Sequence, residues 1–162
     1  MKASYLIILL SLFIFSCNKN QESKSLKKTK KELKFEYDSI LAQKIGADDY
    51  GMKKYVMAFL KSGPNRSQDS TTRAQLQRAH LDNIKKLAEN GKLVLAGPFF
   101  GNDSIRGIYI FDVSSIEEAK QLTNTDPAIK AGTLVMELKE WYGSAALVLL
   151  NNEHKKITKK QI

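Results

Sequence analysis

The 162-residue chain contains one cysteine, two histidines and three prolines. A single cysteine excludes a disulfide within the chain, and so few histidines and cysteines cannot assemble a Cys/His zinc site. The sequence also lacks a phosphate-binding glycine loop, a nucleophile elbow and an HExxH pair. Its carboxylates are scattered singly over predicted helix ends and loops, so they indicate no glycosidase-type pair. The sequence therefore implies no metal and no organic cofactor.

The apolar stretch from Tyr5 to Phe15 is too short to cross a bilayer, which takes about 20 residues in a helix. With Lys2 before it and Ser16 behind it, the stretch is typical of a secretory signal. The segment Ile14-Phe15-Ser16-Cys17 resembles the lipobox of bacterial lipoproteins. That resemblance implies cleavage before Cys17, lipid attachment to Cys17, and a protein anchored at the bacterial cell envelope, periplasmic or surface-facing. The alternative is an ordinary secretory signal with an incidental cysteine.

The formal net charge of +9 belongs to the ends of the chain. Asn18 to Lys34 carries +5 and Glu153 to Ile162 carries +3, whereas Phe35 to Asn152 holds 14 basic and 14 acidic residues. Because the excess lies in ends that we expect to be solvated, it favours attraction to anionic headgroups over binding to nucleic acid. We expect four parts: a signal peptide (1–16), a lipidated cysteine with basic tether and lead-in (17–47), a folded domain (48–150) and a basic tail (151–162).

The folded segment alternates strand-like and helix-like patterns. Runs rich in β-branched and aromatic residues predict four strands and an apolar run predicts a fifth, over residues 53–60, 92–96, 106–111, 134–142 and 145–150. Helical spacing and capping pairs predict helices that begin near Tyr37, Thr72 and Ser115. The order β-α-β-β-α-β is that of a ferredoxin-like split βαβ sheet, an α+β fold.

Such a sheet leaves one apolar face bare once two helices cover the other. A bare face of that size is a liability in a monomer. Two copies could bury it by packing their sheets face to face about a symmetry axis. We therefore expect a homodimer, and the strand predicted over 145–150 is a candidate for reaching across to the partner.

Two residues are candidates for chemistry. His80 lies four residues from both Leu76 and Ile84, on the apolar stripe of its helix. Taken alone, it is more simply a core histidine satisfied by a carbonyl or a water. Asp126 precedes Pro127, which suits a first helical position, so it is predicted to cap a short helical turn over 127–131.

Three segments together resemble the YCII (YciI-like) family: Arg78-Ala79-His80-Leu81, Gly91 to Phe99, and Thr125 to Gly132. The likeness runs from about Tyr50 to Tyr142. It implies a dimeric α+β barrel, in agreement with the predicted strand order.

The resemblance also implies that His80 and Asp126 form a dyad beside a pocket. The leading hypothesis is then a membrane-tethered enzyme in which His80, oriented by Asp126, is a general base or acid for isomerisation or elimination of a small cyclic or carbonyl-bearing substrate. Gly97, Pro98 and Phe99 would form the substrate pocket, since absent or rigid side chains let a ligand approach the backbone. The alternative is a non-catalytic ligand-binding or dimeric structural module at the envelope.

Overall fold

The computed structural model describes residues 36–101 and 103–160. The chain divides after Tyr37, and Asp38–Ile162 form one compact unit. The predicted signal peptide, the lipidated Cys17 and the basic tether all lie outside the described residues. Among the residues described, no helix has the length and apolar character needed to span a membrane.

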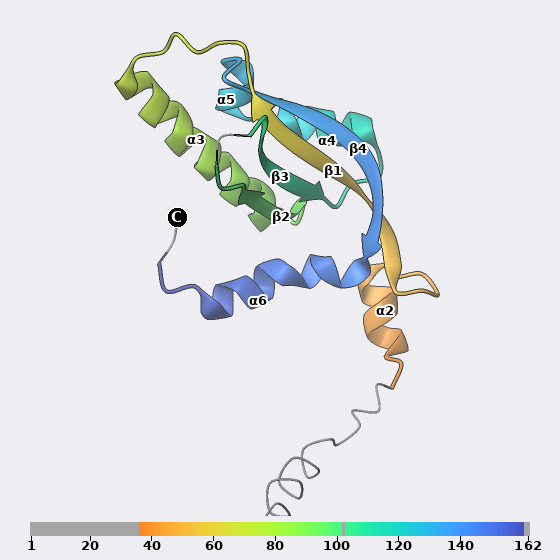
Figure 1. The fold of residues 1–162 in the computed structure, drawn as a ribbon. Coiled ribbons are helices and arrows are strands. Elements are labelled where there is room, and N and C mark those ends of the chain that lie inside the picture. The colour runs from red at the N-terminus through yellow and green to blue at the C-terminus, as the bar shows by residue number, and fades with distance from the viewer. Residues whose placement is uncertain (1–35, 102, 161–162) are drawn as a thin grey trace, which may run out of the picture. The chain divides into compact units, whose positions relative to one another are not determined.

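Four strands form one antiparallel sheet in the order β2-β3-β1-β4, as Figure 1 shows. Their bounds are β1 Met52–Ser62, β2 Leu93–Pro98, β3 Ile105–Phe111 and β4 Leu134–Ser144. The central strand β1 pairs with β4 along its whole length, from Met52 opposite Ser144 to Ser62 opposite Leu134. The predicted α+β fold with a split β-α-β-β-α-β order is confirmed.

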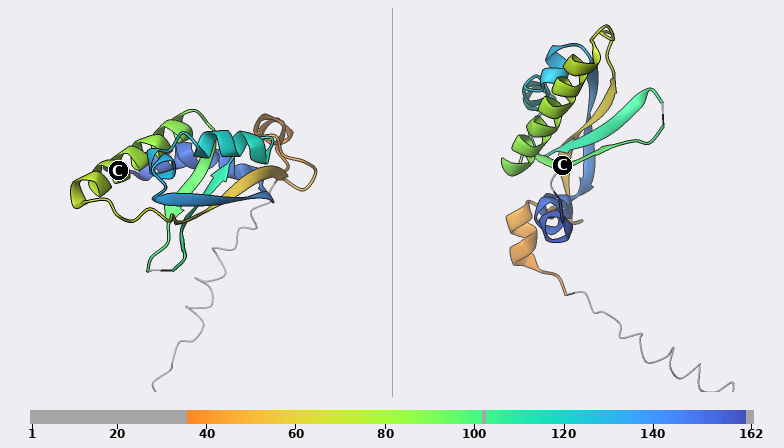
Figure 2. Two further views of the ribbon diagram at one scale, coloured as in Figure 1. Left: turned by 90° about the horizontal axis from the view of Figure 1, so that it is seen from above. Right: turned by 90° about the vertical axis from the view of Figure 1, so that its left-hand side faces the viewer.

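The helices are α2, α3, α4, α5 and α6, with a 3₁₀ helix, η1, between β4 and α6. Their bounds are α2 Ser39–Ile45, α3 Ser70–Glu89, α4 Ile116–Thr123, α5 Pro127–Lys130, η1 Ala145–Leu149 and α6 Leu150–Ile157. In the two views of Figure 2, α3 and α4 lie on the same face of the sheet. The main core lies between them and the sheet, where Leu87 of α3 and Ala119 of α4 pack with Val56, Ala58 and Phe111 of the strands.

Side-chain hydrogen bonds to the backbone cap the first turns of α3 and α4, and the start of α3 differs from the prediction. The N-cap of α3 is Asp69, whose carboxylate accepts from the Thr72 N–H at 2.9 Å, so the predicted capping box at Thr72 is wrong. The helix starts earlier because a carboxylate, a strong capping group, stands three residues before Thr72. Ser115 caps α4 as predicted, with its hydroxyl oxygen 3.1 Å from the Glu118 N–H.

The predicted fifth strand over 145–150 is wrong, because these residues form η1 and begin α6. A short apolar run without alternation does not distinguish a strand from a buried helical turn. The Ser144 hydroxyl accepts from the Ala146 N–H and starts the 3₁₀ turn. Residues 151–157 of the predicted basic tail belong to α6.

The turn η1 covers part of the sheet face that was predicted to be bare. Leu147 and Val148 pack there against the buried side chains of Tyr55, Val94 and Ile110. The chain thus supplies some of the cover that was expected from a second copy.

Candidate active site

His80 reaches the site from the middle of α3. It lies on the stripe that faces the sheet, and with Leu87 it is one of the two buried residues of this helix. Only 7% of its surface is exposed. A polar ring at that depth needs hydrogen-bond partners on both nitrogens. It finds them on α5 and β3.

The first partner is Asp126, which is fully buried at the start of α5. Its Oδ2 atom lies 2.6 Å from Nδ1 of His80. Its Oδ1 atom accepts the Ala128 N–H at 2.8 Å, and Pro127 occupies the first helical position. Asp126 is therefore the helix cap that the Asp-Pro pair predicts, and it contacts His80 as well. The two interpretations of this residue coexist.

The second partner is Tyr109 of β3, whose hydroxyl lies 3.3 Å from Nε2 of His80. Because the carboxylate of Asp126 can only accept, the neutral ring carries its proton on Nδ1 and leaves Nε2 as an acceptor. Tyr109 then donates to Nε2. Burial, and secondarily the charge of Asp126, raise the pKa of Tyr109, so its hydroxyl stays protonated. Two hydrogen bonds therefore connect Tyr109 to His80 and His80 to Asp126.

A groove of about 1010 Å³ opens beside these three hydrogen-bonded residues, and both His80 and Tyr109 line it. One wall is α3 and another is the end of β2, where Gly97 and Pro98 face the groove. Phe99, predicted with them, is not among the lining residues and is half exposed, because β2 ends at Pro98. A Cβ atom at Gly97 would meet nothing within 4 Å, so the missing side chain leaves open space there.

Two parts of the site are missed by the sequence reasoning. Tyr109 lies in a correctly predicted strand, and its alternation with Phe111 could have placed it on the helix-covered face. Its contact with His80 crosses two elements, which local patterns do not reveal. The second omission is the C-terminal helix: His154 and Lys155 of α6 line the groove, whereas the sequence predicts a basic tail over residues 151–162.

Metal binding finds no support in the part of the chain that the structure describes. Within residues 36–101 and 103–160, no group of three or more His, Cys, Asp or Glu side chains could hold a metal ion. The chemistry that the described residues offer is proton transfer at His80, with a donor hydroxyl beside it.

The chain is similar to known proteins in both sequence and structure. The uncharacterized protein YjpA of Bacillus subtilis (strain 168) is 31% identical over 62 residues, which are 38% of this chain and 71% of that protein. A solved structure of 5-chloro-2-hydroxyhydroquinone dehydrochlorinase (TftG) from Burkholderia phenoliruptrix AC1100, in complex with 2,5-dihydroxybenzoquinone, is 21% identical. It has a TM-score of 0.41 and covers 53% of this chain and 92% of that one. The profile of the YCII-related domain matches residues 55–142, and the chain therefore belongs to this family.

Proposed function

We propose that the protein is a small-molecule enzyme in which His80 transfers protons as a general base and acid. The observation that carries the proposal is the buried ring held between two groups of opposite hydrogen-bonding character. Asp126 accepts from Nδ1 at 2.6 Å, and the protonated hydroxyl of Tyr109 lies beside Nε2 at the groove wall. This arrangement orients an acceptor nitrogen towards the place where a ligand would bind.

The reaction class follows from these groups. Nε2 takes a proton from a carbon next to a carbonyl, and the electron pair of that C–H bond moves towards the carbonyl oxygen. Tyr109 is displaced from Nε2 by the substrate and donates to this oxygen, while Asp126 stabilises the protonated ring. Return of the proton to another carbon completes an isomerisation. In an elimination the electron pair returns from the oxygen to form a new C=C bond, and the leaving group on the neighbouring carbon departs with the electron pair of its own bond.

The proposal extends to location. We place the protein at the bacterial envelope, anchored through lipid on Cys17, with the tether of residues 18–34 beside the membrane surface. The lipobox-like segment before Cys17 supports this. Expression in bacteria with labelled palmitate tests it: wild type should carry label in the membrane fraction and Cys17→Ser should not. An unlabelled wild-type chain would refute the anchor.

Proton exchange at a carbon acid tests the catalytic proposal even before the substrate is identified. The full chain is incubated in D₂O with 4-oxocyclohexanecarboxylate and a panel of related cyclic ketones and unsaturated lactones, and deuterium uptake next to the carbonyl is followed by ¹H NMR. We expect exchange above the buffer rate for at least one compound. His80→Gln should slow it about 10²–10⁴-fold, the usual contribution of a general base.

The control variant is Asp82→Asn, two residues along the same helix, where the side chain is 64% exposed and pairs with Arg78. It should exchange at the wild-type rate. If wild type exchanges no member of the panel, or if His80→Gln exchanges as fast as wild type, the catalytic role is wrong. The non-catalytic ligand-binding module then becomes the better description.

A further inference from the structure

Among the described residues, the basic side chains of the strands and loops can be compared with those that line the groove. On the strands and their loops, lysines pair with acids: Lys53 with Asp112 at 2.8 Å and Lys92 with Glu118 at 2.9 Å. The side chains that line the groove include seven basic residues and one acid, Glu89, and one of the seven, Lys85, has an interaction partner of its own. With histidines neutral, the lining has a formal charge of +6. Residues 35–152 are neutral and residues 153–162 carry +3, so the groove lining is more basic than the sequence around it.

Three of these residues are arginines that donate hydrogen bonds to neutral carbonyl groups. Arg66 donates to the Thr133 carbonyl at 3.4 Å, and Arg106 donates to the Gly101 carbonyl at 3.3 Å. Arg73 donates to the backbone of the segment before α3 at 2.8 Å. A carbonyl orients a guanidinium without cancelling its charge. Arginine in such positions retains donors that match the geometry of a carboxylate or phosphate.

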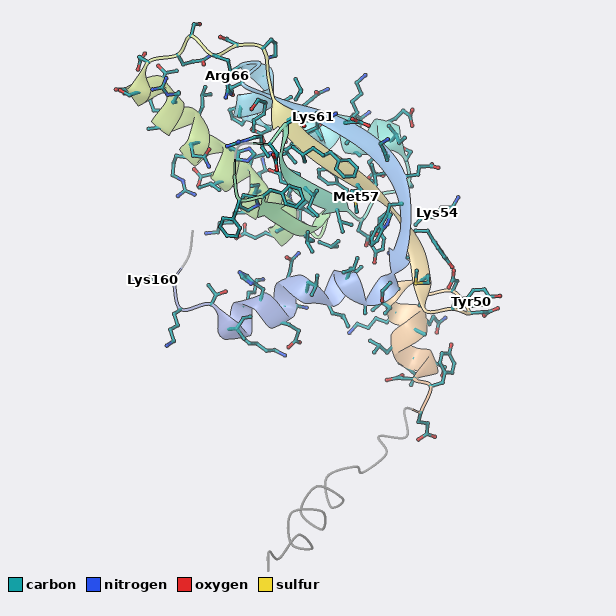
Figure 3. All side chains as sticks on the ribbon, in the orientation of Figure 1. Tyr50, Lys54, Met57, Lys61, Arg66 and Lys160 are labelled. Carbon is teal, nitrogen blue, oxygen red and sulfur yellow. The ribbon has the colours of Figure 1, made fainter. Side chains whose placement is uncertain are left out.

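The C-terminal residues supply three more cations, and the seventh is Lys85 of α3. Asn151 donates to the Leu93 carbonyl at 2.8 Å, which ties α6 to β2. Beyond this contact Lys155, Lys159 and Lys160 line the groove. Figure 3 labels Lys160 beyond the end of α6 and Arg66 before the start of α3. These lysines lie outside residues 55–142, which match the family, so the basic wall is added by this chain's own extension.

The rest of the lining is apolar. Leu76, Leu81 and Ile84 of α3 line the groove together with His80. A bare inorganic ion would leave these side chains uncovered, whereas a molecule with an apolar body and an anionic group satisfies both parts of the surface. Low-dielectric walls also strengthen the attraction that the cations exert on such a group.

We infer that the groove binds a small organic anion, with a carboxylate or phosphate held by the arginines and the C-terminal lysines and an apolar body beside His80. The inference rests on the proposed function for the reacting end of the ligand, and it assigns the substrate class. The anionic group of a lipid offers similar chemistry, and the vesicle experiment below distinguishes that source from a freely diffusing molecule.

The test compares two probes of the same shape and different charge, sodium benzoate and benzamide. Each is titrated into the ¹⁵N-labelled full chain at low salt, and the amide resonances of Gly97 and Gly107, which line the groove, are followed by NMR. We expect saturable shifts with benzoate and at least about fivefold weaker binding of benzamide, since a charge-assisted contact is roughly twice as strong as a neutral one.

A charge-reversal pair locates the binding site. Lys155→Glu with Lys159→Glu should weaken benzoate binding about tenfold, as expected for the loss of paired charges near the ligand. The matched control, Lys44→Glu with Lys54→Glu, makes the same change in net charge at two exposed lysines away from the groove, and it should bind benzoate like wild type. Equal effects of the two double variants, or equal binding of the two probes, would overturn the inference.

Vesicles of phosphatidylglycerol separate the two sources of anion. If the groove variant loses vesicle binding but keeps benzoate binding, the lysines serve a membrane and the inference is wrong. The titrations require no turnover, so they can succeed while the exchange assay fails, and the reverse. The substrate class and the catalytic role are therefore tested separately.

Discussion

The carboxylate of Asp126 joins two elements through its two oxygens: Oδ2 lies 2.6 Å from Nδ1 of His80, and Oδ1 lies 2.8 Å from the N–H of Ala128. The carboxylate cannot turn to follow the imidazole without losing the helix cap. The orientation of a ring on α3 is thus set by the first turn of α5, 46 residues further along the chain. This coupling is the basis of two predictions.

The first prediction concerns the tautomer of His80. Asparagine at position 126 has one acceptor oxygen, and the Ala128 N–H will take it. The amide NH₂ then faces Nδ1, which must accept, so the ring proton moves to Nε2. Long-range ¹⁵N–¹H NMR of the ring nitrogens should show Nδ1–H in wild type and Nε2–H in Asp126→Asn, together with loss of proton exchange. A retained Nδ1–H with undiminished exchange would contradict the orienting role.

The second prediction concerns stability. Asp126→Ala removes a helix cap, at about 1 kcal/mol. It also leaves the Nδ1–H donor of a buried histidine without its partner, at a further ~1–3 kcal/mol. Urea unfolding should give a loss of about 2–4 kcal/mol in the free energy of unfolding.

Asp69→Ala is the matched control, because Asp69 caps α3 at an exposed position. It should cost only the cap, about 1 kcal/mol. If both alanine variants lose the same free energy, the contact between Asp126 and His80 contributes nothing to the fold.

The third prediction concerns alkaline pH. Burial, and then the charge of Asp112, raise the pKa of Tyr55 to about 12, from 10.0 in the unfolded chain. The stability that the neutral hydroxyl contributes is complete below pH 10 and is lost as the pH rises towards 12, because the unfolded chain releases its proton first. Between these pH values the free energy of unfolding should fall less steeply in Tyr55→Phe than in wild type, and the two slopes should differ by about 1.4 kcal/mol per pH unit. Parallel slopes in urea titrations at pH 10 to 12 would show that Tyr55 ionises equally in both states.

The fourth prediction compares two glycines of the β2–β3 hairpin. A Cβ atom at Gly107 would lie 2.6 Å from the Gly97 carbonyl oxygen, whereas one at Gly97 has nothing within 4 Å. Gly107→Ala should therefore lower the free energy of unfolding by about 1–3 kcal/mol through overpacking. Gly97→Ala should fold as stably as wild type and bind benzoate more weakly, because it narrows the groove. A destabilised Gly97→Ala, or one with unchanged benzoate affinity, would exclude Gly97 from the pocket.

The fifth prediction concerns the expected homodimer. On the second face of the sheet, Phe59 lies opposite Ile108, and both remain only partly buried beside the cover that η1 provides. We propose that a second copy packs on this row. Light scattering of the full chain should give twice the mass of one chain, and Phe59→Lys should halve it. Lys54→Glu, an exposed change on the same strand, should leave the mass unchanged. A wild-type mass of a single chain would refute the dimer.

Local signals in the sequence identified much of this fold. The Ser115 cap and the Asp-Pro start of α5 depend on neighbouring residues, and both were predicted. The run at 145–150 was misassigned because its conformation depends on where Leu147 and Val148 find apolar partners on the sheet. Those partners include Tyr55 and Ile110, which are distant from residues 145–150 in the sequence.

The site shows the same division. His80 was located by helical spacing, and its pairing with Asp126 was expected from family resemblance. The Tyr109 hydroxyl and the groove wall of α6 were missed because only tertiary packing brings them together. The net charge of the C-terminal residues predicts a solvated tail. In the structure, several of the lysines after residue 153 line the groove instead.

The pairing of β1 with β4 has a consequence for how the protein is made. The partners of Met52 and Ser62 are Ser144 and Leu134, some seventy to ninety positions later in translation. The ribosome must therefore release nearly the entire domain before the central strand acquires its second neighbour, and until then one edge of that strand is open to rival pairings. Ribosome-bound chains that end before residue 134 should depend on chaperones. Chains long enough for α6 to have left the exit tunnel should not.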